Sequence, residues 1–210
     1  MDRLTSQIIT ALIDTLRTEN PIPLHEPFFL GREKEYAIDC LETRYVSSIG
    51  SYVDRFEKDL ARFTGHKHAI AVVNGTSALH AALILSGVEP DDEVLLPSLT
   101  FVATANAIAY CNAVPHFVDS CEKTLGIAPE PLELYLKKNT KIENSTCINK
   151  ITGRPIKAMI PVHIFGMPGH LDPLLEVCKK FHLTMIEDAA ESLGSYYKNR
   201  HTGHHGRLAV

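Results

Sequence analysis

The fold is decided by residues 92–110, DEVLLPSLTFVATANAIAY. Glu93–Pro97 is a short apolar run bounded by turn residues, which predicts a buried strand. Phe101–Tyr110 follows after a short turn and is predicted to be a helix. An apolar strand without an alternating polar face, followed at once by a helix, is typical of a parallel sheet that helices cover on both sides.

The same alternation continues to both sides of this stretch. Further strands are predicted at Ala69–Val73, Val114–Val118, Ala158–Val162 and Thr184–Glu187, and further helices at Ser77–Leu85, Pro131–Lys137 and Pro173–Phe181. Residues 137–157 are the most polar region and are predicted to form a surface excursion before a central strand. The predicted fold class is therefore α/β, a mostly parallel sheet with helices on both faces.

The N-terminal part is organised differently. Residues 1–19 have the pattern of an amphipathic helix, and Asn20–Pro27 contains three prolines, which predict an extended connector. Two further helices are predicted at Glu33–Tyr45 and Ser51–Thr64. We therefore divide the chain into an N-terminal helix and arm, residues 1–30, and a main domain, residues 31–210.

Composition excludes several classes of protein. The 210 residues include 21 lysines and arginines against 25 acidic residues, so the net charge of -4 gives no general attraction to nucleic acid. No apolar run approaches the length that crosses a bilayer, and the N-terminus lacks a signal peptide's apolar block, which indicates a cytoplasmic protein without a membrane partner. The five cysteines form no CxxC pair, so neither a disulfide framework nor a zinc ribbon is indicated.

The ends of the predicted strands carry the candidate binding residues, because ligands of open parallel sheets lie beyond the carboxyl ends of the strands. Asn74 and Gly75 form a tight turn between a strand and a helix, where free backbone amides and the helix dipole favour a phosphate group. Gly75 would let the anion approach the backbone, and Thr76 and Ser77 would add hydroxyl donors. The alternative is that Thr76 or Ser77 merely caps the helix.

Two other strand ends offer groups for a flat, charged ring. Asp188 closes an apolar strand, and a buried acid of this kind can pair with a protonated heteroaromatic nitrogen; the alternative is an acid that caps the next segment. Phe101 could stack on a flat ring, or it could belong to the core. His201–His205 contains three histidines but no accompanying acid or cysteine at a fixed spacing, so we expect a glycine-rich loop without a metal.

Five motifs, taken in order along the chain, resemble the DegT-type family of pyridoxal-phosphate-dependent nucleotide-sugar aminotransferases. Enzymes of this family have the aspartate aminotransferase fold, fold type I. The motifs are SSIG (47–50), NGTSALH (74–80), DEVLLPSLTFVATAN (92–106), VHIFG (162–166) and EDAAESLG (187–194). The resemblance extends from about Pro23 to Val210 and identifies the N-terminal portion of such an enzyme.

The resemblance implies pyridoxal 5′-phosphate as the cofactor and a role for each candidate residue. Gly75–Ser77 match the turn that holds the phosphate, Phe101 matches the aromatic residue that stacks on the pyridine ring, and Asp188 matches the acid that keeps the ring nitrogen protonated. Glu191 stands where the family often has Gln or His near the 3-oxygen of the ring. A glutamate at this position is a departure from the family pattern, and it concerns the hydrogen bond that Gln or His would donate.

A second departure concerns the lysine that forms the Schiff base. In the family this lysine follows the segment matched by Gly206–Val210, so it would lie beyond Val210, and no catalytic residue is assigned in the chain. We expect a truncated fragment that carries an incomplete cofactor-binding large domain, lacks the C-terminal small domain and is inactive by itself.

The expected function is transfer of an amino group from glutamate to a nucleotide-linked keto-sugar in surface-polysaccharide biosynthesis, by a homodimer when full length. Residues 95–101, LLPSLTF, look most like relatives that act on a UDP-4-keto-6-deoxy-N-acetylhexosamine. Two alternatives stay open: a sugar dehydratase of the same family, in which a histidine replaces the lysine, and a non-catalytic binding or regulatory module.

Overall fold

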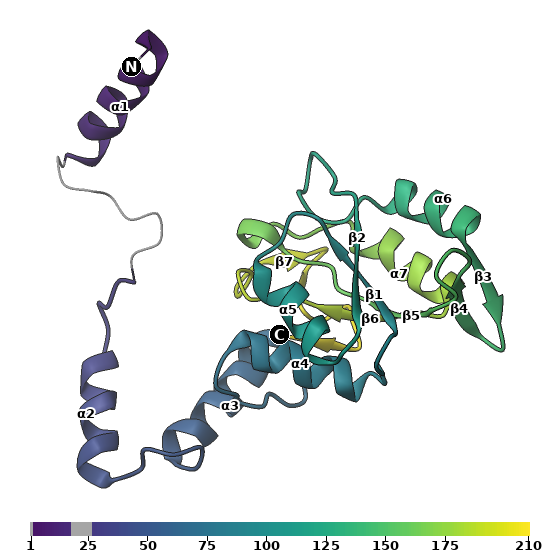
Figure 1. The fold of residues 1–210 in the computed structure, drawn as a ribbon. Helices are drawn as coiled ribbons and strands as arrows, with labels where there is room; N and C mark the ends of the chain where they lie inside the picture. Colours follow the sequence, from purple (N-terminus) through teal and green to yellow (C-terminus); the bar gives the residue numbers. More distant parts are fainter. Residues whose placement is uncertain (1, 18–26) are drawn as a thin grey trace. The chain divides into compact units, whose positions relative to one another are not determined.

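The computed structural model describes residues 2–17 and 27–210 (Figure 1). The predicted connector, Asn20–Pro27, lies outside the described residues except for Pro27. The chain divides into two compact units, Met1–Ser47 and Ser48–Val210. The division at residue 30 that we expected from the sequence stays a prediction.

The described residues of the first unit form two helices, both predicted from the sequence. Helix α1 spans Arg3–Leu16 and begins where the side chain of Asp2 accepts a hydrogen bond of 2.7 Å from the amide of Thr5. It ends at Arg17, which has a left-handed backbone. Helix α2 spans Glu33–Thr43. Neither these helices nor any other in the described part of the chain is long and apolar enough to cross a membrane.

The second unit begins with two helices and continues with the predicted alternation of strands and helices. The helices are α3 (Ser51–Thr64), α4 (Gly75–Leu85), α5 (Val102–Tyr110), α6 (Pro129–Asn139), α7 (Leu171–Phe181) and the 3₁₀ turn η1 (Ile164–Gly166). The strands are β1 (Glu93–Pro97), β2 (Val114–Val118), β3 (Thr140–Glu143), β4 (Thr146–Asn149), β5 (Pro155–Met159), β6 (Thr184–Glu187), β7 (Tyr196–Tyr197), β8 (Arg200–His201) and β9 (Leu208–Ala209).

The main sheet is mostly parallel, with β2, β1, β5, β6 and β9 side by side in that order. The hairpin of β3 and β4 adds to the start of β5 in the antiparallel direction. A small separate sheet pairs β7 with β8. The parallel strands and the helices that follow them confirm the predicted α/β class.

Each face of the sheet has its own apolar core. On one face, α4 and α5 contribute residues such as Leu83 and Ile108, which share a cluster with Leu96 of β1. On the other face, α6 and α7 contribute residues such as Leu174, which share a cluster with Leu95. Consecutive residues of β1 thus point to opposite layers, which explains why the strand has no polar face.

One predicted strand is wrong. Ala69–Val73 has no strand structure, and the side chains of Ile70 and Val73 are 79% and 86% exposed. A strand exists only where a neighbouring backbone pairs with it. In this segment the amide of Ala71 instead donates a hydrogen bond of 2.8 Å to the carboxylate of Glu57. The segment is rich in residues that favour strands, which explains the prediction. Among the described residues no neighbouring strand pairs with it, so no strand forms.

Two smaller differences concern the region before the central strand. Strand β5 lies three residues earlier than predicted, although the amide of Ile160 still bonds the carbonyl of Leu95 at 2.8 Å. The polar region 137–157, predicted as a surface excursion, contains the β3–β4 hairpin, which was not predicted. The two residues of its turn, Asn144 and Ser145, both have positive φ, which matches the twist of a two-residue hairpin.

A buried carboxylate holds this hairpin against β1. Glu93 accepts hydrogen bonds from Asn149 Nδ2 at 2.9 Å, Thr152 Oγ1 at 2.6 Å and the ring of His116 at 2.6 Å. Burial alone would raise the pKa of Glu93, but these three bonds together lower it below its ordinary value of 4.5.

Glu93→Gln is therefore expected to lower the free energy of unfolding at pH 7 by about 1–3 kcal/mol, because donors aimed at the carboxylate lose their acceptor. Since the folded pKa lies below the ordinary one, this stabilisation is present above pH 4.5 and is lost as the pH falls through the folded value. Urea unfolding at pH 7 and pH 4 measures both effects. Glu143→Gln, on the exposed hairpin, is the control, and an equal loss in both variants would contradict the prediction.

Candidate functional site

The start of helix α4 is the turn that the sequence predicts as a phosphate site. Asn74 caps the helix, since its side chain accepts the amide of Ser77 at 2.9 Å. Thr76 and Ser77 lie inside the first turn, so the alternative that one of them caps the helix is wrong. With the amide of Ser77 taken by the cap, the amides of Gly75 and Thr76 are left at the positive end of the helix dipole.

Asp188 follows the last residue of β6 and is buried. Thr104 of α5 donates to its Oδ2 at 2.8 Å, and Thr100 lies 2.8 Å from Thr104, which extends the hydroxyl chain to the surface. The amide of Ala190 reaches Oδ1 at 3.4 Å. Burial raises the pKa of Asp188, against the hydrogen bond from Thr104, and an unpaired buried carboxylate of this kind attracts a cation.

Val210 joins these two features. Its amide donates to the carbonyl of Glu187 at 2.9 Å, and its carbonyl accepts the amide of Ala189 at 2.7 Å, which continues the pairing of β9 with β6. A methyl group placed on Gly75 would lie 4.0 Å from Val210 Cγ1. The α4 turn and Asp188 therefore lie on either side of the end of β9, at the carboxyl edge of one sheet.

The other two sequence-predicted residues lie on loops at the strand ends. Phe101 precedes α5 and is 75% exposed, so it does not belong to the core. Glu191 is exposed, and its Oε2 accepts the amide of Phe165 at 2.7 Å. These positions leave the ring of Phe101 available to a ligand and tie Glu191 to the η1 turn. Their roles toward a cofactor stay predictions.

Sequence reasoning missed the roles of three residues that support this edge. Thr104 holds Asp188, Asn74 caps α4, and His163 donates to the carboxylate of Glu187, with its ring nitrogen Nε2 3.0 Å from Oε2. The partner of His163 lies 24 residues away in sequence, and no local pattern indicates it.

The histidines of β8 and of the loop that follows it contact other residues of the chain. His201 accepts the amide of Gly194 at 2.8 Å, and the ring of His204 stacks on that of His66 with centroids 4.5 Å apart. Within residues 2–17 and 27–210, no three His, Cys, Asp or Glu side chains are grouped so that they could hold a metal ion.

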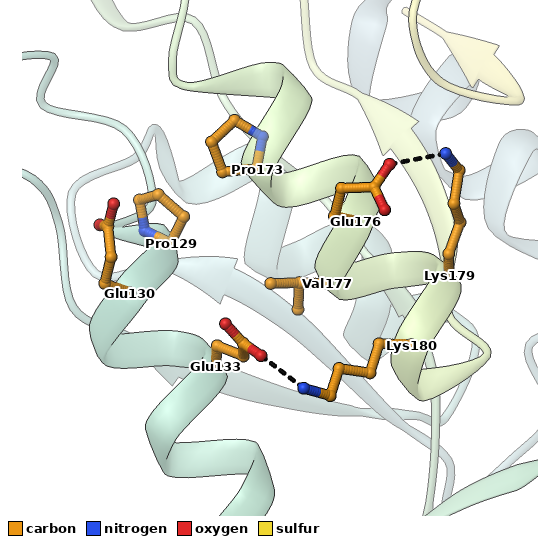
Figure 2. Close-up of a pocket in the computed structure, with 8 residues that line it drawn as sticks. All are labelled: Pro129, Glu130, Glu133, Pro173, Glu176, Val177, Lys179 and Lys180. Carbon is orange, nitrogen blue, oxygen red and sulfur yellow. Dashed lines mark hydrogen bonds and ion pairs between the residues drawn. The ribbon is translucent and has the colours of Figure 1, made fainter.

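A hollow of about 530 Å³ lies elsewhere, between α6 and α7 (Figure 2). Val177 forms part of its floor, and ion pairs join Lys180 to Glu133 at 2.6 Å and Lys179 to Glu176 at 2.7 Å. Both lysines are thus paired with carboxylates of the same helix layer. The groove lies on the outer surface of this layer, on the face of the sheet opposite to α4 and α5.

Comparison with known proteins agrees with this architecture. The chain is 39% identical over 189 residues to GDP-perosamine synthase of Caulobacter vibrioides, covering 90% of this chain and 47% of that protein. It is 38% identical over 189 residues to GDP-perosamine synthase of Escherichia coli O157:H7, covering 90% and 48%. A solved aminotransferase from Brucella abortus is 32% identical with a TM-score of 0.72, covering 85% of this chain and 48% of that one.

The chain thus spans about half the length of the curated relatives that it matches. Residues 30–210 match the DegT/DnrJ/EryC1/StrS aminotransferase family, which confirms the resemblance in the five motifs. Pyridoxal phosphate is the cofactor of these enzymes, as expected from the sequence. Because the match covers most of its length, the chain belongs to the DegT/DnrJ/EryC1/StrS aminotransferase family.

Proposed function

We propose that the chain carries the cofactor-binding part of a pyridoxal-phosphate-dependent sugar aminotransferase. Its substrates would be a nucleotide-linked keto-sugar and an amino-acid donor, for which we propose glutamate. The observation that carries the proposal is the meeting of an open helix start at Gly75 and a buried carboxylate at Asp188 on either side of Val210.

The residues present fit the cofactor at both of its charged ends. The amides of Gly75 and Thr76, with the hydroxyls of Thr76 and Ser77, would bind the phosphate. Asp188 has one oxygen that accepts Thr104 and a second that receives only a long bond from Ala190, so it could accept a proton-bearing ring nitrogen. The α4 turn would thereby serve as the anion site and Asp188 as the cation site, at the same edge of the sheet.

Phe101 and Glu191 would complete the site. We propose that the exposed ring of Phe101 stacks on the cofactor ring and that Glu191 lies toward the 3-oxygen. When bound, pyridoxal phosphate supplies an electron-withdrawing ring that stabilises a carbanion next to the reacting nitrogen. The task of Asp188 is then to hold a proton on the ring nitrogen, and the task of the α4 turn is to fix the orientation of the ring.

For the nucleotide sugar, we propose a GDP-linked keto-sugar that becomes an amino sugar similar to GDP-perosamine. The support is that the two curated relatives described above are GDP-perosamine synthases, at 39% and 38% identity. The expectation of a UDP-linked N-acetylhexosamine, which came from residues 95–101, has no such support. Glutamate-dependent amination of GDP-linked and UDP-linked 4-keto-6-deoxy sugars, measured in one assay with a protein that also carries the Schiff-base lysine segment, decides between them.

We also propose that the enzyme works in the cytoplasm as a homodimer. The resemblance to the family is the source of this proposal, and the exposed apolar side chains of Phe56, Phe63, Ile70 and Val73 in the second unit are consistent with an interface. Sedimentation equilibrium of a protein that also carries the Schiff-base lysine segment tests the assembly: a dimer is expected, and a monomer at every concentration would reject it.

Binding of pyridoxamine 5′-phosphate tests the cofactor assignment, because this form carries both charged ends and needs no lysine to hold it. We expect saturable binding by calorimetry, weakened by inorganic phosphate that competes for the α4 turn. No binding would reject the enzyme proposal and leave a non-catalytic module. Binding together with loss of water from the sugar, and no amino transfer, would indicate the dehydratase instead.

A further inference from the structure

Glu187, the residue before Asp188, has an unusual set of partners. Its carboxylate is fully buried and accepts four hydrogen bonds. Oε2 accepts His163 Nε2 at 3.0 Å and the amide of Gly203 at 2.9 Å, while Oε1 accepts the amides of His205 and Gly206 at 2.7 and 2.6 Å. Burial by itself would raise the pKa of Glu187, but these bonds lower it, so the group stays ionised.

The loop of residues 203–206 is folded around this carboxylate. Three of its four amides point at one side chain, which makes a backbone nest of the kind that binds anions. Glycine is needed at both ends: Gly203 has φ +86°, and a methyl group on Gly206 would lie 2.9 Å from the carbonyl oxygen of Met185. The nest is filled by the chain's own Glu187, so its amides do not bind the cofactor phosphate.

The loop leads directly to the candidate site. After Gly206, the amide of Arg207 donates to the carbonyl of Met185 at 2.9 Å, and β9 then continues to Val210, against Gly75. On the other side of Glu187, the amide of His163 donates to the carbonyl of Asp188 at 3.1 Å. The carboxylate therefore binds both the residue that holds the Asp188 backbone and the segment that lies against the α4 turn.

We propose that Glu187 is a positioning residue of the cofactor site: its four hydrogen bonds fix the distance between Asp188 and the α4 turn. The inference rests on the proposed function, because it concerns the site of the same cofactor. It differs from a purely structural role in one respect. A structural carboxylate affects stability alone, whereas Glu187 affects affinity for a ligand that it does not touch.

Glu93 provides a matched control for this distinction. It is a second buried glutamate in the same sheet, it has three side-chain donors, and its pKa is also lowered. It lies at the amino end of β1, whereas Glu187 lies at the carboxyl end of β6, where the site is. Both Gln substitutions leave donors without an acceptor, so both are expected to destabilise the fold.

The experiment compares calorimetric binding of pyridoxamine 5′-phosphate to wild type, Glu187→Gln and Glu93→Gln, at a temperature where circular dichroism shows each to be folded. We expect binding about tenfold weaker in Glu187→Gln, as is found when residues that orient the ligands of a bound metal are replaced. We expect unchanged binding in Glu93→Gln. Amide hydrogen exchange without ligand should become faster at Ser77 and Ala78, whose amides bond to Asn74 in the α4 turn, in Glu187→Gln alone.

If Glu187→Gln does not fold, His163→Leu replaces it, since this change removes one of the four donors and leaves three backbone amides on the carboxylate. A smaller loss of affinity in the same direction is then expected. Equal binding by wild type and the variant would overturn this inference and leave the proposed function standing. Absence of binding by wild type would overturn the proposed function and this inference with it.

Discussion

Asp188→Asn is expected to weaken binding of pyridoxamine 5′-phosphate by about 10- to 100-fold, which corresponds to the loss of one hydrogen bond to a charged group. The carboxylate is buried and has an oxygen without a strong partner, so a protonated ring nitrogen would supply the missing cation. An asparagine keeps the shape and the contact with Thr104 but lacks the charge. Calorimetric titration measures the difference.

The same substitution is expected to raise the melting temperature of the cofactor-free chain, because it removes the free-energy cost of burying the charged carboxylate. Each 1 kcal/mol of this cost corresponds to about 2–4 °C. Burial raises the pKa of Asp188 in the folded state, so the ionised carboxylate destabilises the fold. This cost is absent below the ordinary pKa of 3.8 and grows as the pH rises through the raised folded value. The stability difference between the variant and wild type should therefore disappear at low pH.

The matched control is Asp172→Asn on α7, where the carboxylate is half-exposed and paired with Lys198. This variant should bind pyridoxamine 5′-phosphate as wild type does and should not be stabilised. A loss of stability in Asp188→Asn with unchanged affinity would show that the acid serves the fold, and would contradict its proposed role.

Thr76→Glu is expected to reduce binding of the same ligand by more than about 100-fold, because a carboxylate near the phosphate repels it by several kcal/mol in a partly buried site. The fold should survive, since an acid in the first turn of a helix interacts favourably with the helix dipole, and α4 has no acid there. The introduced carboxylate thus occupies the proposed phosphate site, while helix α4 stays intact.

Thr5→Glu serves as the control for this second variant. It makes the same exchange in the first turn of α1, which also lacks an acid and lies outside the residues matched by the family. We expect unchanged affinity and helicity in Thr5→Glu. Wild-type affinity in Thr76→Glu would mean that the phosphate binds elsewhere.

Local signals in the sequence predicted most of the fold. The bounds of β1, β2, β6 and α3 agree with the structure to the residue, because each is a short apolar or amphipathic run flanked by turn residues. Ala69–Val73 has the same local signal and is not a strand, since no strand in the described part of the chain pairs with it. Local pattern indicates which residues suit a strand, and pairing decides whether one forms.

The candidate site shows the same limit. Gly75–Ser77 and Asp188 could be chosen from the sequence because strand ends in an α/β fold lie at one edge. Thr104, His163 and Glu187 could not, since their roles depend on contacts between segments 16 to 84 residues apart, such as Thr104 with Asp188. The alternative in which Thr76 or Ser77 caps the helix named the wrong residues, because Asn74, Thr76 and Ser77 are all of the types that cap helices.

The most direct test of the account is a crystal structure of the chain with pyridoxamine 5′-phosphate. We predict that the phosphate lies against the amides of Gly75 and Thr76, with the ring nitrogen within hydrogen-bond distance of the Asp188 carboxylate. A ligand found in the groove between α6 and α7, with its phosphate on Lys179 or Lys180 and Asp188 bonded only to the protein, would contradict the account.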